Sequence, residues 1–201
     1  MSQEPATPQA LIKLLERGVD KCAQRLGRLS YSTWNVDTVS LSSGASAAPG
    51  DLMGASNEKH FGTFLGIPGG GFLVIFPEKS GFLVTNRFTL SGADPVDALP
   101  NRESTVLAEV SNIIINALTD VLAEACGKTL MLSAPEPIQG PKKEILQSAL
   151  GRFSQAGKLA WICYVRLKTP TFSSHCDLVA FLDSELFRLL SGGQGPAVPE
   201  G

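Results

Sequence analysis

Apolar residues recur every three or four positions in two long stretches of the chain, residues 10–26 and 104–125. This spacing places the apolar side chains on one side of a helix and the polar ones on the other. The second stretch stops at Gly127, the residue type that most readily adopts the left-handed conformation found just after a helix. The pattern therefore predicts two long amphipathic helices, each with a polar side in solvent.

Shorter apolar stretches, rich in β-branched and aromatic residues and bounded by Gly, Pro or Ser, predict strands. The expected strands are residues 30–41, 60–67, 71–76, 128–132, 159–168 and 177–181. The second and third of these are joined by Pro68-Gly69-Gly70, which predicts a hairpin turn. Short helices are expected over residues 77–87, 142–153 and 183–190.

The two halves of the chain repeat the same order of elements: long helix, strand, variable segment, two strands and short helix. Residues 73–82 (LVIFPEKSGF) align with residues 178–187 (LVAFLDSELF), with Leu, Val, Phe and Phe at equal spacing. We interpret this as an internal duplication, with pseudo-repeats of about 10–90 and 103–190 in a single domain spanning residues 10–190. The expected fold is α+β. A duplicated αβ(x)ββα unit places two long helices on one face of a continuous antiparallel sheet.

The segments between and beyond these elements are small, polar and rich in Gly or Pro. Residues 42–57 (SSGASAAPGDLMGASN, from Ser42) predict a flexible loop, and residues 91–102 a linker. Residues 1–9 and 191–201 are expected to be disordered ends.

Composition narrows the classes of function. The 201-residue chain is 43% hydrophobic and 18% charged, with a net charge of -2, so we expect neither nucleic acid nor an anionic membrane as partner. The chain has no run of about 18 or more apolar residues, so we expect no transmembrane helix, and the first residues lack the pattern of a signal peptide. The four cysteines are far apart in apolar surroundings, which indicates reduced thiols and a cytoplasmic protein.

Two Gly-containing motifs resemble phosphate-binding loops without matching them. Gly127-Lys128-Thr129 ends like such a loop, but position 122 is Leu where the first Gly is required, and the motif follows a helix. We interpret it as a helix stop with a basic residue beside the helix end. The Gly-rich segment 66–71 lies between two strands and predicts a hairpin turn.

Other titratable residues form no recognised metal or catalytic motif. His175 and Cys176 together with Cys163 lack the paired spacing of metal ligands. Asp120 and Glu124 lie one helical turn apart near a helix end, which is typical of a solvated edge. His60 stands alone and is interpreted as structural.

The polar side of the second long helix is unusual. Thr105, Glu109, Asn112 and Asn116 fall at i, i+4, i+7 and i+11 and so share one face. A face chosen only for solubility usually carries Lys, Glu and Arg, whereas this one presents one carboxylate and two amides. The local pattern leaves both interpretations open, a solvated face and a surface that positions a partner or a reacting group.

The wider pattern resembles a known family. Thr105-x3-Glu109-x2-Asn112 is followed after a long gap by Pro135, similar to the signature of the CheC/CheX/FliY chemotaxis phosphatases: Asp or Ser, then E-x-x-N, then a distant Pro. The FLVIFPE junction, the segment LTDVLAEACGKTLMLSAPEP and the duplicated layout are also similar to CheC, over roughly residues 10–190. Thr105 departs from the signature but keeps a hydroxyl group.

The first long helix lacks the signature. Aligning Cys22-Ala-Gln-Arg-Leu26 with the second helix puts Lys13 in place of the Glu and Glu16 in place of the Asn. Val39 occupies the position of the Pro. We therefore expect one site rather than two.

The resemblance implies an activity and a set of partners. The implied substrate is the aspartyl phosphate of a CheY-like response regulator, with Mg²⁺ supplied by the phosphorylated regulator and no cofactor held by this chain. Asn112 would orient the attacking water, and Glu109 would dock against a Lys of the regulator. Thr105 and Asn116 would flank the contact.

Two other interpretations remain open. In the first, the protein is a non-catalytic module that binds a receiver domain or a CheD-like deamidase. In the second, it resembles the middle domain of a flagellar switch protein. The sequence leaves open whether it is a monomer or a homodimer.

Overall fold

A computed structural model describes residues 9–43, 57–89, 101–154 and 159–191. The helices are α1 (Gln9–Ser30), α3 (Glu78–Thr89), α4 (Arg102–Cys126), α5 (Lys142–Ser154) and α6 (Ser184–Leu190). The strands are β1 (Asn35–Ser43), β2 (Lys59–Ile67), β3 (Gly70–Pro77), β4 (Glu136–Pro141), β5 (Leu159–Thr169) and β6 (Ser174–Asp183).

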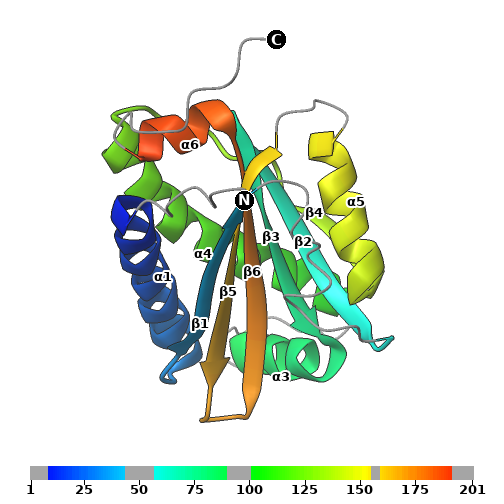
Figure 1. Cartoon of the computed structure of the whole chain (residues 1–201). Helices are drawn as coiled ribbons and strands as arrows, with labels where there is room; N and C mark the ends of the chain where they lie inside the picture. Colours follow the sequence, from blue (N-terminus) through cyan, green and yellow to red (C-terminus); the bar gives the residue numbers. More distant parts are fainter. Residues whose placement is uncertain (1–8, 44–56, 90–100, 155–158, 192–201) are drawn as a thin grey trace, which may run out of the picture.

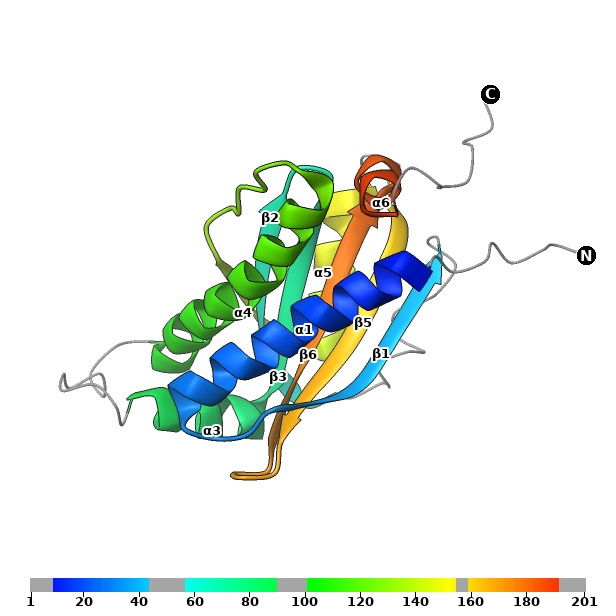
Figure 2. The same ribbon diagram turned by 90° about the vertical axis from the view of Figure 1, so that its left-hand side faces the viewer.

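The strands form one six-stranded sheet in the order β1-β5-β6-β3-β2-β4, and all neighbouring strands are antiparallel. The long helices α1 and α4 lie side by side across one face of this sheet (Figure 2). Helix α5 lies on the other face, beside β2 and β4 (Figure 1). The predicted α+β fold, with two long helices on one face of a continuous antiparallel sheet, is confirmed.

The apolar core is divided by the sheet. The larger cluster lies between the sheet and helices α1 and α4, and includes the stacked rings of Trp161 and Phe187, with centroids 4.5 Å apart. The smaller cluster lies under α5, where Ile145, Leu146 and Ala149 pack on the opposite face of the strands. Burial of apolar surface on both faces is the main driving force for this arrangement.

The internal duplication is visible in the sheet itself. The two central strands, β3 and β6, pair so that Leu73 lies opposite Val179 and Val74 opposite Leu178. In the sequence alignment Leu73 corresponds to Leu178 and Val74 to Val179. Exchanging the two halves therefore maps this pairing onto itself, as expected for two related halves that meet about a pseudo-twofold axis. Helices α3 and α6 accordingly lie at opposite ends of the sheet (Figure 1).

The two long helices pack about the same axis. Gly18 of α1 meets Leu118 of α4, and the Cys22 thiol donates a hydrogen bond to the carbonyl of Ile114 at 3.1 Å. In the helix alignment Gly18 corresponds to Ile114 and Cys22 to Leu118, so the two contacts exchange when the halves are exchanged. This agreement supports the alignment that places Lys13 opposite Glu109 and Glu16 opposite Asn112.

The close approach of α1 and α4 predicts a specific sensitivity. A Cβ atom added at Gly18 would lie 2.4 Å from Cδ1 of the fully buried Leu118. We expect Gly18→Ala to lower the free energy of unfolding by about 1 kcal/mol, because overpacking outweighs the gain in helix propensity. The matched control is Gly151→Ala in α5, where no atom lies within 4 Å and stability should rise. Urea unfolding measures both, and a stabilised Gly18→Ala variant would contradict the packing.

One predicted strand was wrong. Residues 128–132 form no strand, and the fourth strand is Glu136–Pro141, a segment to which the sequence interpretation assigned no element. Proline is tolerated on an edge strand, where the missing N–H would face outward, and β4 pairs only with β2. Ser133 fixes the preceding segment, since its backbone N–H donates to the Gly66 carbonyl and its hydroxyl accepts from the Gly66 N–H, both at 2.9 Å.

The other elements match the predictions, but their ends differ: α1 continues to Ser30, so β1 begins at Asn35 and not at residue 30 as predicted, whereas β6 is longer than predicted. The hairpin turns at Pro68-Gly69, where Gly69 has a φ of 78°, and Asp183 caps α6 by accepting a hydrogen bond from the Leu186 N–H. Nearly all of the predicted 42–57 loop and of the 91–102 linker lies outside the described residues. The same holds for residues 1–8 and 192–201, so the predictions of disordered ends are not tested.

Candidate functional site

The polar stripe of α4 lies on the surface of the molecule. Thr105 and Glu109 are exposed, Asn112 and Asn116 are half-buried, and all four share the side of α4 that faces away from the sheet. Helix α4 is long and apolar enough to cross a membrane by composition alone. Its apolar side chains are buried in the larger cluster, however, as in a core helix of a globular domain.

The carboxylate of Glu109 differs from those nearer the end of α4. Asp120 and Glu124 form ion pairs with Arg25 and Arg17 of α1, at 2.8 and 3.1 Å. They therefore link the two long helices, a role that the predicted solvated edge did not include. Among the described residues the side-chain carboxylate of Glu109 has neither an ion pair nor a hydrogen bond, so its charge is available to a partner.

The two amides of the stripe are joined to each other. Nδ2 of Asn116 donates to Oδ1 of Asn112 at 3.0 Å and to the backbone carbonyl of Asn112 at 2.8 Å. The amide NH₂ of Asn112 has no hydrogen-bond partner among the described residues. A carbonyl oxygen has two lone pairs, so Oδ1 of Asn112 retains one acceptor position as well.

Strand β4, which follows Pro135 in the chain, packs against α4. The amide of Gln139 in β4 donates to the hydroxyl of Ser104, near the start of α4. Pro135 is half-buried and lies four residues before Gln139, in the segment that leads into β4. The signature Pro therefore precedes a strand that contacts the helix of Glu109 and Asn112.

The corresponding stripe of α1 carries different chemistry. Gln9, Lys13, Glu16 and Asp20 occupy the positions equivalent to Thr105, Glu109, Asn112 and Asn116, and all four are exposed. A cation replaces Glu109, and carboxylates replace both amides. Of the two related stripes, only that of α4 carries amides at the positions of Asn112 and Asn116.

The other sequence candidates do not form sites. Gly127 has a φ of 63°, and the Lys128 N–H donates to the Ala123 carbonyl, which is the geometry of a helix stop. Cys163 and Cys176 lie in the cluster under α1 and α4, whereas His175 lies on the opposite face of the sheet. Burial raises the pKa of the Cys163 thiol to about 12, so this cysteine stays protonated. His60 is buried, with Nδ1 2.7 Å from the Glu58 carbonyl oxygen.

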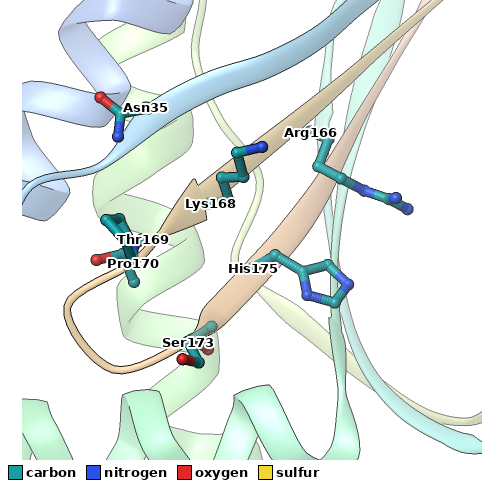
Figure 3. Close-up of a pocket in the computed structure, with 8 residues that line it drawn as sticks. Asn35, Arg166, Lys168, Thr169, Pro170, Ser173 and His175 are labelled. Atoms are coloured by element: carbon teal, nitrogen blue, oxygen red, sulfur yellow. The ribbon is translucent and has the colours of Figure 1, made fainter.

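A second polar region, which the sequence interpretation missed, lies at the turn between β5 and β6. It borders a cavity of about 320 Å³ (Figure 3). The cavity is lined by Asn35, Arg166, Lys168, Thr169, Pro170, Ser173, Ser174 and His175. Its two cations are engaged within the fold: Arg166 pairs with Asp177 at 2.7 Å, and Lys168 pairs with Asp37. Burial lowers the pKa of His175, which is therefore neutral near pH 7. This cavity presents little uncompensated charge to a ligand.

The structure defines a class of fold that is shared by the CheC, CheX and FliY chemotaxis proteins and by the middle domain of FliM. No family model matches the sequence, and no curated protein matches it significantly.

Solved structures carry the comparison. FliY from Thermotoga maritima superposes with a TM-score of 0.66 and 11% identity, covering 95% of this chain and 100% of FliY. The chemotaxis protein CheX from Desulfovibrio desulfuricans superposes with a TM-score of 0.57 and 14% identity, covering 85% of this chain and 99% of the CheX chain. The FliM middle domain from H. pylori superposes with a TM-score of 0.60 and 9% identity, covering 94% of this chain and 100% of the FliM chain. At these identities the likeness establishes the fold alone.

Proposed function

We propose that the protein is a phosphatase that removes the phosphoryl group from the aspartyl phosphate of a CheY-like response regulator in chemotaxis or related two-component signalling. The observation that carries the proposal is the pair of the exposed Glu109 and the half-buried Asn112 on the outward face of α4, in a fold shared with CheX and FliY. The expected location is the cytoplasm, where response regulators are phosphorylated.

The chemistry of the stripe suits this reaction. An acyl phosphate is already activated, so its hydrolysis requires chiefly a water molecule held in line with the phosphorus. A neutral amide can hold that water without adding negative charge beside the phosphoryl group, and Asn112 is assigned this role. It acts like the water-orienting Gln of GTPases. The Mg²⁺ that neutralises the phosphoryl charge comes with the regulator, and no residue of this chain is assigned to bind it.

Glu109 is assigned the docking role. It lies one helical turn before Asn112, and its charge has no partner among the described residues. A Lys near the phosphorylated Asp of the regulator would pair with it. Such a pair fixes the orientation of two surfaces and discriminates against wrong partners. The flanking Thr105 and Asn116 complete the stripe that meets the regulator.

The primary test is a phosphate-decay assay. The purified protein, added in catalytic amounts, should accelerate the loss of phosphate from a phosphorylated CheY-like receiver domain in the presence of Mg²⁺. Candidate regulators from the same genome are the substrates of choice. If the protein binds a phosphorylated receiver domain but leaves its decay rate unchanged, the phosphatase proposal fails.

That outcome would favour the second candidate, a non-catalytic module that binds a receiver domain or a CheD-like deamidase. The α1 stripe, with Lys13 and Glu16 in place of the signature residues, fits such a module as well as it fits a one-site enzyme. The FliM middle domain also shares the fold, with a TM-score of 0.60. Binding without turnover separates these candidates from the phosphatase.

Replacing Glu109 should affect docking more than turnover. We expect Glu109→Ala to raise the KM for the phosphorylated receiver domain about tenfold or more, because the regulator Lys loses its partner in a desolvated contact. Steady-state decay rates at varied regulator concentration measure this change. The matched control is Lys13→Ala, at the equivalent exposed position of α1, which should leave KM unchanged. Equal effects of the two substitutions would exclude the assigned docking face.

A further inference from the structure

The amide of Asn112 is held by its neighbour one helical turn later. Asn116 donates from Nδ2 both to Oδ1 and to the backbone carbonyl of Asn112, at 3.0 and 2.8 Å. The terminal torsion of an Asn side chain is broad and nearly two-fold, so an unsupported amide samples several orientations. The contact with Asn116 removes that freedom, because the reversed orientation would bring two NH₂ groups together.

The contact also decides which atoms of Asn112 remain for a substrate. One lone pair of Oδ1 is taken by Asn116, whereas the other lone pair and the NH₂ group have no partner among the described residues. Both members of the pair are half-buried, which shields their hydrogen bond from competing water. The outward part of the amide is thus presented in a defined orientation.

The related helix shows that the two amides form a unit. Its equivalent residues are Glu16 and Asp20, and both amide positions are carboxylates there. Two ionised carboxylates are acceptors only and cannot hydrogen bond to each other. The helix that lacks the signature Asn therefore also lacks the donor that would hold it.

We propose that Asn116 is a positioning residue that orients the amide of Asn112 for the attacking water. This inference rests on the proposed phosphatase function, and it adds a residue outside the E-x-x-N…P signature. Asn116 acts through Asn112 and does not need to touch the phosphoryl group. Misplacing a reacting group by about 1 Å is enough to slow an enzyme strongly, so a residue of this kind should affect kcat.

The test is a double-mutant cycle in the phosphate-decay assay. Asn116→Ala should lower kcat about tenfold and raise KM less than Glu109→Ala does, because the docking contact of Glu109 is kept. In the Asn112→Ala background the same substitution should have no further effect, since the amide that it orients is already absent. Asn116→Gln, which keeps an amide donor, should recover part of kcat. Asp20→Ala, at the equivalent position of α1, is the control and should keep full kcat.

A second measurement examines the hydrogen bond without reference to activity. The side-chain NH₂ signals of Asn112 in an NMR spectrum should shift and average in Asn116→Ala, while the backbone signals of α4 stay in place. Unchanged Asn112 signals would overturn the positioning role. Two kinetic results would also overturn it. One is an unchanged kcat of Asn116→Ala when the wild-type protein accelerates decay, and the other is additive effects of the two substitutions in the double mutant. Absence of any acceleration by the wild-type protein overturns the phosphatase function itself, and the NMR arm then reports separately on the amide pair.

Discussion

Asn112→Ala should lower the kcat for dephosphorylation of a receiver domain about 100-fold or more, with little change in KM. The amide of Asn112 is the neutral group on the α4 stripe that can hold a water without adding negative charge beside the phosphoryl oxygens. Removing it leaves the water unpositioned in the transition state, and water-orienting and proton-transferring groups typically contribute this much to a rate. A 100-fold loss corresponds to about 2.7 kcal/mol of transition-state stabilisation.

The expected separation between kcat and KM distinguishes this role from docking. A group that acts only in the transition state lowers kcat and kcat/KM together, whereas lost docking raises KM. Single-turnover decay of the phosphorylated receiver, measured at saturating enzyme, reports the chemical step directly. Binding of the receiver to Asn112→Ala, measured by titration calorimetry, should match that of the wild type. A raised KM at unchanged kcat would reassign Asn112 to the docking surface.

The matched control is Glu16→Ala on α1. Glu16 occupies the position equivalent to Asn112, is exposed, and lies on a helix of the same layer. The substitution shortens the side chain at the equivalent helical position and removes a negative charge, but it removes no amide. Equal loss of activity in Glu16→Ala and Asn112→Ala would indicate that the two helices act alike and would exclude a single site on α4.

The sequence was sufficient to predict the layers of the fold because its signal is local and repeated. Helical periodicity in α1 and α4 can be recognised without knowledge of distant contacts. The alignment of residues 73–82 with residues 178–187 indicated that both halves have the same order of elements. The strand β4 was missed because Pro137 and Gly140 lower its intrinsic propensity. It forms because β2 offers an edge to pair with, which is a property of the assembled sheet.

The candidate site was predictable to a similar extent. The common face of Glu109, Asn112 and Asn116 follows from helix geometry alone, and an Asn pair at i and i+4 is a known helix contact. The inclusion of Pro135 in the candidate site came from the family signature, since no local rule relates a loop to a helix that precedes it. The charged network around Asp177 was missed altogether, although a lone Asp within the apolar strand Cys176–Leu182 was a visible sign of it.

Asp177→Ala should be among the most destabilising single substitutions in this protein, lowering the free energy of unfolding by about 3 to 5 kcal/mol. The Asp177 carboxylate is 1% exposed and accepts hydrogen bonds from Lys142 at 2.6 Å, Arg166 at 2.7 Å and Tyr164 at 2.8 Å. The Lys142 side chain is only 5% exposed, so removing the carboxylate takes the 2.6 Å ion pair away from a buried ammonium. Arg166 is a third exposed and can turn to solvent.

Two comparisons isolate the cause of this effect. Asp37→Ala removes a carboxylate that pairs with the exposed Lys168, and it should cost no more than about 1 kcal/mol. The double substitution Lys142→Met with Asp177→Leu removes both buried charges and should recover most of the stability that Asp177→Ala loses. Urea unfolding of the four proteins measures the differences. A double variant as unstable as Asp177→Ala would show that the loss of stability comes from altered packing and not from the loss of the Lys142–Asp177 ion pair.

Acid should weaken the wild-type protein through the same carboxylate. Burial by itself raises the pKa of Asp177, but the hydrogen bond from Arg166 and the charge of Lys142 outweigh it, and the pKa falls below its ordinary value of 3.8. A folded-state pKa below the unfolded one stabilises the fold at pH values above the unfolded pKa, and this contribution is lost as pH falls through the folded pKa. The free energy of unfolding of the wild type should therefore decline on acidification below about pH 4. Asp177→Ala, already lacking the carboxylate, should show a shallower decline over the same range, and parallel declines would place the acid sensitivity elsewhere in the fold.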